Sequence, residues 1–283
     1  MTIRVVTDST AYLPEGFADR HRVDVVPLHV LVDGRSFTDG AELGPAELVQ
    51  ALRGHAMVST SRPNPEDLAE RYRALLADGA SEVVSVHLSR ELSGTWEAAC
   101  RAAERVGNVR VVDSRSTAMG LGFAVLAAAR AAGEGQTGER VEAAAVETAE
   151  RTATWFCVPT MEYLRRGGRI GTAAALLGTA LAVKPVLHIE DGRITGVEKV
   201  RTMSRAKARL IDLASTAAGT GRARLAVHHL GAKDQATLLA EELAARLPAA
   251  AGVLVSEVGA VIGAHTGPGV LGVVVLPESV ESH

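Results

Sequence analysis

Hydroxyl and glycine residues occur at Ser93-Gly94-Thr95, in the segment SRELSGTW (89–96) that directly follows a predicted buried strand. The preceding run VVSVHL, residues 83–88, has the length and β-branched content of a buried strand, and residues 97–106 have a helical pattern. The amino terminus of a helix leaves N–H groups unpaired and carries a positive partial charge, so this loop suits the oxygens of a phosphate or a carboxylate. The commoner role of such a serine is to cap the helix, so the loop alone leaves both functions open.

A second hydroxyl loop lies in VSTSRPNP, residues 58–65, where Thr60 and Ser61 follow a short apolar element and two prolines lead into a predicted helix. A third loop, Asp8-Ser9-Thr10, follows the first predicted strand and is expected to form an Asx turn and cap. Ligands of open α/β sheets bind outside the carboxyl ends of the strands. We therefore expect these loops to face one crevice.

A histidine precedes a glycine-rich turn in GAHTGPGVLGVVV, residues 263–275. His265 would be held close to the backbone there, with a charge adjustable near neutral pH, and could donate a hydrogen bond to a carboxylate or be purely structural. The other histidines, including the adjacent His228 and His229, lack the spacing of metal ligands. The sequence predicts no metal site.

Two further segments have an unusual composition. YLRRGGRIG, residues 163–171, is expected to be either a mobile cationic loop for a phosphate or acidic partner, or a solvated surface turn. Residues 172–183 are mostly small, which would leave room for an aliphatic chain or allow tight packing. Arg201 is a further cation that is expected to be exposed.

Composition and missing signatures exclude several classes of protein. With 30 basic and 33 acidic residues and a net charge of −3, the chain has no broad electrostatic footprint for nucleic acid. It contains no GxSxG, GxxxxGK[ST], HExxH or GxGxxG after the first strand, which disfavours hydrolases, NTPases and dehydrogenases. Two isolated cysteines, Cys100 and Cys157, argue against a disulfide framework or a zinc site.

The predicted location is the cytoplasm. The two cysteines fit a reducing compartment, and the amino-terminal sequence has no pattern of a secretory signal. The apolar stretch at residues 173–183 is broken by Gly178 and falls short of the roughly 20 residues that a membrane helix needs.

The 283 residues predict two domains of the α/β class, with a boundary after residue 159. Residues 1–159 alternate between strand and helix patterns, which indicates a mostly parallel sheet flanked by helices. Residues 160–283 predict an α+β domain with a mixed sheet that begins with a hairpin turning at Asp191-Gly192. The predicted strands cover residues 3–6, 23–32, 83–88, 109–112, 155–158, 184–189, 193–200, 223–229, 252–257 and 270–276. The predicted helices cover residues 45–54, 65–78, 94–106, 116–132, 138–152, 204–218 and 233–247.

The joint occurrence of several motifs resembles the DegV family, from the first strand to the last. These motifs are TDST (7–10), STSRPNP (59–65), LSGTW (92–96), VDSRSTAMGLG (112–122), LRRGGRI (164–170), KPVLHIEDGRI (184–194) and HTGPGVLG (265–272). Each is weak alone, and their combination in order is specific. The third position of the TSQP-type motif is Arg62 here, which is expected to alter the surface of that loop without affecting Thr60.

The resemblance implies a carrier without catalytic residues or a cofactor that binds one long-chain fatty acid. Its carboxylate would lie at the domain interface, and its tail in an apolar tunnel formed by residues 160–283. The partner would be a separate ATP-dependent fatty acid kinase subunit that makes an acyl phosphate for bacterial phospholipid synthesis, and lipid exchange would involve transient contact with a membrane surface. By the same resemblance, the carboxylate is bound by Thr60, Ser61, Ser93, Gly94 and His265, and the kinase or phosphate faces Arg169 and Arg201.

Two other functions remain open from the sequence. Ser93 could be the nucleophile and His265 the base of an acyl hydrolase, although no acidic partner is singled out. The chain could also be a kinase subunit that binds a small carbonyl compound through histidine.

Overall fold

The computed structural model describes residues 2–176 and 183–278. Its contacts divide the chain into two compact units, residues 1–29 with 60–150 and residues 30–59 with 151–283. The second unit thus takes in residues 30–59 in addition to the carboxyl-terminal half, whereas the sequence predicted a single division after residue 159. The function assigned to each predicted domain stays a prediction.

A four-stranded sheet forms the centre of the first unit. Its strands lie in the order β2 (Val23–Val26), β1 (Ile3–Asp8), β6 (Glu82–His87) and β7 (Val109–Asp113), and every pair is parallel. Val6 pairs with Ser85 and Thr7 with Val86, so β1 and β6 end at the same edge of the sheet. The loops that follow these two strands, which the sequence singled out, therefore start side by side.

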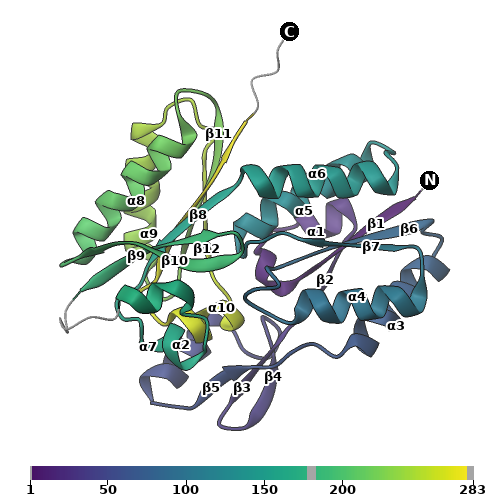
Figure 1. The fold of residues 1–283 in the computed structure, drawn as a ribbon, viewed down its shortest axis with the longest axis horizontal. Coiled ribbons are helices and arrows are strands. Elements are labelled where there is room, and N and C mark those ends of the chain that lie inside the picture. Colours follow the sequence, from purple (N-terminus) through teal and green to yellow (C-terminus); the bar gives the residue numbers. More distant parts are fainter. Residues whose placement is uncertain (1, 177–182, 279–283) are drawn as a thin grey trace. The chain divides into compact units, whose positions relative to one another are not determined.

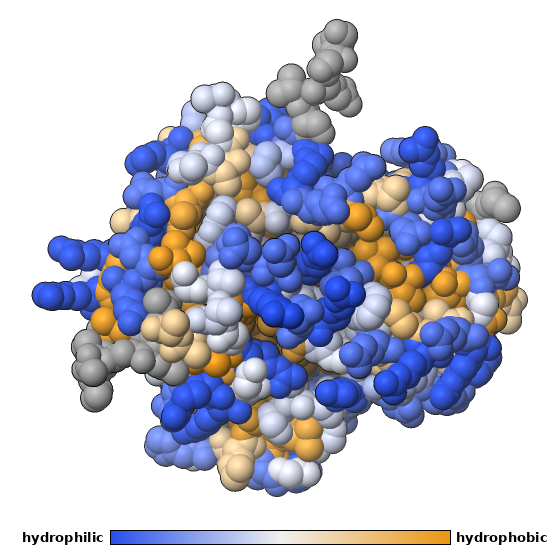
Figure 2. Space-filling model, viewed as in Figure 1, coloured by the Kyte–Doolittle hydropathy of each residue, from blue (hydrophilic) through white to orange (hydrophobic). Residues whose placement is uncertain are grey.

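Helices cover both faces of this sheet, as the sequence predicted (Figure 1). The helices of the unit are α1 (Phe17–His21), α3 (Pro65–Ala77), α4 (Thr95–Val106), α5 (Met119–Gly133) and α6 (Gly138–Arg151), with the short 3-10 helix η1 (Ser9–Ala11) after β1. Leu68 and Tyr72 of α3 and Ala99 of α4 pack on Val6 of β1 in one core cluster. On the opposite face α5 contacts β1 and β6. Figure 2 shows hydrophobic residues at the surface between α4 and α6, where the edge strand β7 places the half-buried Val109 and Val111.

The second unit is built on a six-stranded mixed sheet. The order is β10 (Arg193–Val200), β9 (Lys184–Glu190), β8 (Ala153–Cys157), β13 (Leu271–Pro277), β11 (Ala223–His229) and β12 (Val253–Glu257), and only the pair β11 and β12 is parallel among those described. The sequence had placed β8 with the amino-terminal sheet, and this was wrong because β8 pairs with β9 and β13. Helices α8 (Met203–Ala218) and α9 (Lys233–Arg246) bury their apolar sides against the sheet.

The predicted hairpin at Asp191-Gly192 is confirmed. Strands β9 and β10 are antiparallel, and Asp191 has φ 49° and Gly192 φ 80°. Two consecutive left-handed residues form the kind of turn that matches the twist of a hairpin, and aspartate followed by glycine adopts it at low cost. Position 192 thus uses the conformational freedom of glycine.

A small three-stranded sheet has the order β4 (Arg35–Thr38), β3 (His29–Val32) and β5 (Val58–Thr60), and α2 (Pro45–Arg53) connects β4 to β5. The sequence predicted one strand over residues 23–32, whereas the structure ends β2 at Val26 and begins β3 at His29. Pro27 lies in the break, and proline has no N–H to donate to a strand ladder.

Three short helices near the carboxyl-terminal half were not predicted: α7 (Glu162–Arg166), the 3-10 helix η2 (Gly171–Leu176) and α10 (Ala260–Thr266). Within residues 2–176 and 183–278, no helix has both the length and the apolar composition needed to cross a bilayer.

Candidate functional site

The loop after β6 is a hydrogen-bonded turn that leads into α4. The carbonyl of Ser89 accepts the N–H groups of Leu92 and Ser93 at 3.0 Å each, and Ser89 N–H donates to the carbonyl of Ser116 at 2.8 Å. Ser93 Oγ lies 2.8 Å from Thr95 Oγ1 and accepts Thr95 N–H at 3.3 Å. The hydroxyl of Ser93 therefore contacts the first residue of α4, but the N-cap is Gly94, whereas the capping interpretation had expected Ser93.

The backbone N–H of Gly94 can donate a hydrogen bond to a ligand. Gly94 is the N-cap residue that precedes α4, and its N–H donates to no acceptor in the described parts of the chain. Ser93 N–H, by contrast, is already bonded to Ser89. Any backbone contribution from this loop to an anion must therefore come from Gly94, reinforced by the positive partial charge at the start of a 12-residue helix.

The loop of Thr60 and Ser61 lies against the loop of Ser93 and Gly94. Ser61 N–H donates to the carbonyl of His29 at 3.2 Å, which fixes the chain as it leaves β5. The side chain of Arg62 then covers Gly94, since a Cβ on Gly94 would lie 2.9 Å from Arg62 Cδ. The two hydroxyl loops of the first unit are thus neighbours, and Arg62, the departure from the family motif, is the residue that connects them.

The third loop has the Asx turn that the sequence predicted. Asp8 Oδ1 accepts Thr10 N–H at 3.1 Å and caps η1. Asp8 Oδ2 also accepts the N–H of Leu88 at 3.1 Å, so this carboxylate joins the loop after β1 to the loop after β6.

His265 lies in the last turn of α10 rather than in a turn bounded by glycines, which corrects the sequence prediction. Its imidazole packs directly on the backbone of Gly167, where a Cβ would come within 2.0 Å of Nδ1. Burial, and secondarily the positive charge of Arg169, lowers the pKa of His265 from 6.5 to about 4. The imidazole is therefore neutral at pH 7, whereas the sequence had suggested a charge adjustable near that pH.

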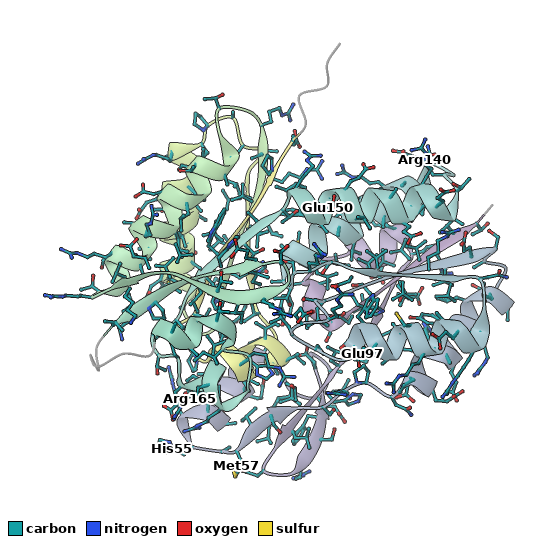
Figure 3. The ribbon with its side chains drawn as sticks, in the orientation of Figure 1. His55, Met57, Glu97, Arg140, Glu150 and Arg165 are labelled. Carbon is teal, nitrogen blue, oxygen red and sulfur yellow. The ribbon has the colours of Figure 1, made fainter. Side chains whose placement is uncertain are left out.

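The predicted mobile cationic loop at residues 163–171 is partly helical and anchored. Helix α7 buries Leu164, and the Tyr163 ring lies against Gly267, just after α10. Arg165 is exposed on the surface of α7 (Figure 3), whereas Arg169 is half-buried and its Nη1 donates to the carbonyl of Gly167 at 2.6 Å. Of the arginines in this motif, Arg169 is the one whose charge reaches His265.

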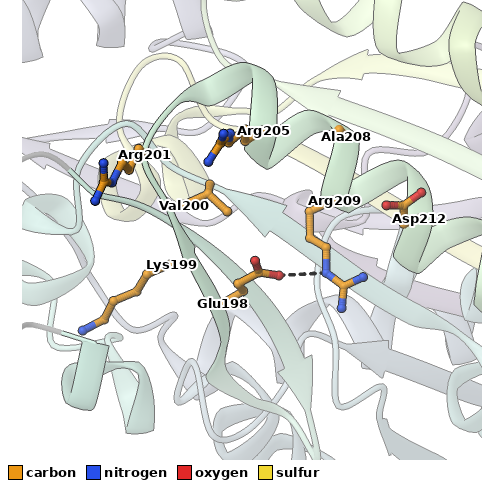
Figure 4. Close-up of a pocket in the computed structure, with 8 residues that line it drawn as sticks. All are labelled: Glu198, Lys199, Val200, Arg201, Arg205, Ala208, Arg209 and Asp212. Carbon is orange, nitrogen blue, oxygen red and sulfur yellow. Dashed lines mark ion pairs between the residues drawn. The ribbon is translucent and has the colours of Figure 1, made fainter.

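Arg201 lies at a separate place in the second unit, where β10 passes into α8. It is exposed and lines a hollow of about 350 Å³. Figure 4 shows Glu198 and Arg209 paired at 3.0 Å on one side of this hollow, with Lys199 and Arg201 on the other. The lining residues are Glu198, Lys199, Val200, Arg201, Arg205, Ala208, Arg209 and Asp212. Four of these eight are cations, so the hollow favours anionic groups.

The segment expected to hold an acyl tail lies partly outside the described residues. Residues 171–176 form η2, which packs on β10 so closely that a Cβ on Gly171 would lie 2.4 Å from the carbonyl oxygen of Ile194, and residues 177–182 are not described. The predicted tunnel therefore stays a prediction. Among the described residues, no group of three or more His, Cys, Asp or Glu side chains is arranged to hold a metal ion.

Sequence reasoning missed the contacts that hold these residues in place. Gly167 supports the imidazole of His265, Arg62 covers Gly94, and Asp8 binds the N–H of Leu88. The paired glycines of the RRGGRI motif were a usable signal, because glycine in a sequence often marks either a left-handed turn or close approach by another group. Gly167 has φ −72° and is of the second kind.

Comparison with known proteins identifies close relatives along the whole chain. Residues 2–278 match a family described as "Uncharacterised protein, DegV family". A DegV domain-containing protein of Streptomyces coelicolor is 53% identical over 274 residues, which cover 96% of this chain and 98% of that protein.

Two solved structures are similar over the same extent. One reports fatty acid binding by a DegV family protein from Thermus thermophilus, with 39% identity, a TM-score of 0.93, and coverage of 98% of this chain and 100% of that one. The other is DegV from Bacillus subtilis, described as a fatty acid binding protein, with 33% identity, a TM-score of 0.90 and the same coverage of both chains. The family match over residues 2–278 and the relatives at this level of identity establish that the chain belongs to the DegV family.

Proposed function

We propose that this protein binds one long-chain fatty acid and presents its carboxylate to a separate ATP-dependent kinase subunit. The observation that carries the proposal is the similarity, over 98% of the chain, to two solved proteins that are described as binding fatty acids. The chemistry of the candidate residues supports it, because they offer neutral hydrogen-bond donors and a helix terminus.

The proposed carboxylate contacts are Thr60, Ser61, Ser93, Gly94 and His265. Two loops of the first unit carry the hydroxyl residues, and the side chain of Arg62 in one loop lies against Gly94 in the other. The Gly94 N–H has no protein acceptor in the described part of the chain. In the second unit His265 is a neutral imidazole at pH 7, which can donate one hydrogen bond without adding a buried charge. Such donors favour a carboxylate over a polar uncharged head group.

The acyl tail would supply most of the binding free energy. Burial of one methylene contributes about 0.8 kcal/mol, so a chain of about fifteen carbons contributes on the order of 10 kcal/mol before the costs of ordering. The head group contacts then select the acid and orient it. We propose that residues 160–283 form the tunnel for this tail.

The electrostatics of His265 disfavour the alternative of an acyl hydrolase. The histidine of a Ser-His-Asp triad must become an imidazolium during the reaction, and a carboxylate stabilises it. Here burial and the neighbouring cation Arg169 both disfavour the charged form. Ser93 Oγ, the candidate nucleophile, is engaged by Thr95. We therefore propose a carrier and not an enzyme.

In the proposed reaction the bound acid is the nucleophile and the kinase subunit supplies ATP. A carboxylate oxygen of the acid forms a bond to the γ-phosphorus of ATP, the bond to the β-phosphate oxygen breaks, and ADP leaves. The exposed Arg201 and the half-buried Arg169 are the residues proposed to face the kinase or the transferred phosphate. The anionic preference of the hollow beside Arg201 suits an acidic surface on that partner.

Binding can be tested directly with purified protein. Native mass spectrometry of protein isolated from cells should show the added mass of one fatty acid, and delipidated protein should take up one equivalent of stearate by calorimetry. Failure to detect any bound lipid, together with no uptake of fatty acids of 14 to 20 carbons, would refute the carrier function. Ester turnover that is abolished by Ser93→Ala would instead support the hydrolase.

A further inference from the structure

A chain of buried polar side chains lies beneath the candidate loops of the first unit. Tyr72 of α3 donates from its hydroxyl to Ser85 Oγ at 2.8 Å, Ser85 Oγ lies 2.7 Å from His87 Nε2, and His87 Nδ1 lies 3.0 Å from Asp8 Oδ2. All four side chains are fully buried. The arrangement has the connectivity of a Ser-His-Asp triad, but Ser85 is occupied by Tyr72 and has no access to a substrate.

Hydrogen bonds connect this chain of side chains from Tyr72 to Asp8. Burial raises the pKa of Tyr72 far above its usual value, so Tyr72 stays protonated and donates to Ser85. Ser85 Oγ is hydrogen-bonded to His87 Nε2, and because a carboxylate only accepts, His87 Nδ1 donates to Asp8. The chain of hydrogen bonds therefore ends at the carboxylate of Asp8.

The carboxylate of Asp8 accepts four donors, which come from Thr10 after β1, from the last residue of β6 and from the loop after β6. Thr10 donates to Oδ1 from its N–H at 3.1 Å and from its hydroxyl at 2.5 Å. Oδ2 receives the N–H of Leu88 at 3.1 Å and the ring of His87 at 3.0 Å. A carboxylate accepts at both oxygens, and an amide at the same position would accept at one and donate at the other. The four donors thus require the acid at position 8.

Leu88 is the first residue of the loop that carries Ser93 and Gly94. From Leu88 the loop continues through the bond of Ser89 N–H to Ser116 and the bonds of Leu92 and Ser93 to the Ser89 carbonyl. Hydrogen bonds therefore hold this loop along its length, and the first of them is the bond from Leu88 N–H to Asp8. A displacement at Leu88 would move the Gly94 N–H and the Ser93 hydroxyl together.

We propose that Asp8 is a positioning residue that fixes the loop of residues 88–94 in the geometry that recognises the fatty acid carboxylate. This inference rests on the proposed function. Asp8 does not contact the ligand in this arrangement, because it is fully buried and its oxygens are saturated by protein donors. Its effect passes through Leu88.

The decisive variant is Asp8→Asn, which keeps the shape of the side chain. Its NH₂ group must face either the N–H of Leu88 or that of Thr10, so one of the two loops loses its anchor. The matched control is Asp24→Asn in the adjacent strand β2. Asp24 is also buried and accepts Arg4 Nη2 at 2.7 Å and a guanidinium nitrogen of Arg71, but these partners do not belong to either loop.

The readout compares stearate with octadecan-1-ol, which has the same tail and no carboxylate, on delipidated full-length protein. Asp8→Asn should weaken stearate binding about tenfold or more and change octadecanol binding less than about twofold. Asp24→Asn should leave the ratio of the two dissociation constants unchanged. Hydrogen exchange in peptides of residues 88–94 should accelerate in Asp8→Asn and not in Asp24→Asn.

A milder variant covers the case in which Asp8→Asn does not fold. Thr10→Val is nearly isosteric and removes only the hydroxyl donor to Oδ1, so it should show the same pattern with a smaller loss. Unchanged stearate affinity in both folded variants, or equal losses for stearate and octadecanol, would overturn the inference while binding by the wild-type protein upholds the proposed function. If the wild-type protein binds no fatty acid, both fail.

Discussion

The imidazole of His265 rests on the backbone of Gly167, so that a single methyl group on residue 167 would come within 2.0 Å of Nδ1. The φ of Gly167 is −72°, which alanine adopts without strain, so the conflict is purely steric. Gly167→Ala should therefore displace the ring and weaken fatty acid binding by about tenfold or more, if His265 contacts the carboxylate. Calorimetry with stearate measures the change.

Gly221→Ala is the matched control in the same unit. A methyl group on Gly221 would meet no atom within 4 Å, and the φ of this residue is not in the left-handed range. This variant should bind stearate as tightly as the wild type. An undiminished affinity in Gly167→Ala would mean that the position of His265 does not matter for the ligand.

The buried His228 and the half-buried His265 predict that the second unit loses stability in mild acid. Burial lowers the pKa of His228, bonded at 2.9 Å to Ser256, and that of His265, each to about 4 from 6.5. Between pH 4 and pH 6.5 the unfolded chain binds protons that the folded chain does not. The contribution of these histidines to the free energy of unfolding is therefore complete above pH 6.5 and is lost as the pH drops toward 4. Each histidine contributes on the order of 3 kcal/mol to this loss.

The fluorescence of Trp155, which stacks on His188 in the same unit, can follow this transition in a Trp96→Phe background. Urea midpoints should decline from pH 7 to pH 4.5, and His265→Gln should flatten part of the decline. A midpoint that does not change across this range would contradict the burial of neutral imidazoles.

Gly122 in α5 is predicted to be intolerant of any side chain. A Cβ there would lie 2.6 Å from the carbonyl oxygen of Ala11 and 2.5 Å from Met119 Sδ, and the carbonyl belongs to backbone that cannot move alone. Gly122→Ala should lower the free energy of unfolding by about 2 kcal/mol in urea titrations. Gly133→Ala, at the end of the same helix with no atom within 4 Å, should be neutral or slightly stabilising.

The two cysteines should differ in reactivity from ordinary thiols. Burial raises the pKa of Cys157 to about 12 and also raises that of the half-buried Cys100. Because the thiolate is the reactive form, the native protein at pH 8 should react slowly with a thiol reagent at Cys100 and not at all at Cys157. Both should react at once in denaturant. Rapid modification of Cys157 in the folded protein would contradict its packing against β13.

Local signals in the sequence predicted the elements, whereas contacts between distant residues decided the rest. Asp191-Gly192 predicted its hairpin because the turn depends on two adjacent residues. Helix α10 was missed because Gly263 weakens helix propensity, and its place there comes from packing so close that a Cβ would lie 2.4 Å from Leu48 Cδ2. The sheet to which β8 belongs depends on its pairing with β13, more than a hundred residues away.

The same distinction applies to the candidate site. Residue types pointed to Ser93, Thr60 and His265, and the resemblance to a family gave them a role. The supporting contacts of Arg62 with Gly94 and of Asp8 with Leu88 join segments that the sequence separates by 32 and 80 residues. No local pattern encodes such pairs.

Arg201 provides a test that separates presentation of the ligand from its binding. The residue is exposed beside Lys199 and Arg205 in the hollow between β10 and α8, so its replacement leaves the core intact. Arg201→Glu should leave the affinity for stearate within about twofold, because the proposed head group contacts lie elsewhere, and should lower acyl phosphate formation about tenfold or more in a reconstituted assay with the kinase subunit. Trapping the acyl phosphate with hydroxylamine measures the product. Arg140→Glu introduces the same charge change at an exposed position of α6 and serves as the control. Equal rates for the two variants would show that the hollow beside Arg201 is not where the kinase subunit binds, since a general repulsion between two charged proteins would affect both.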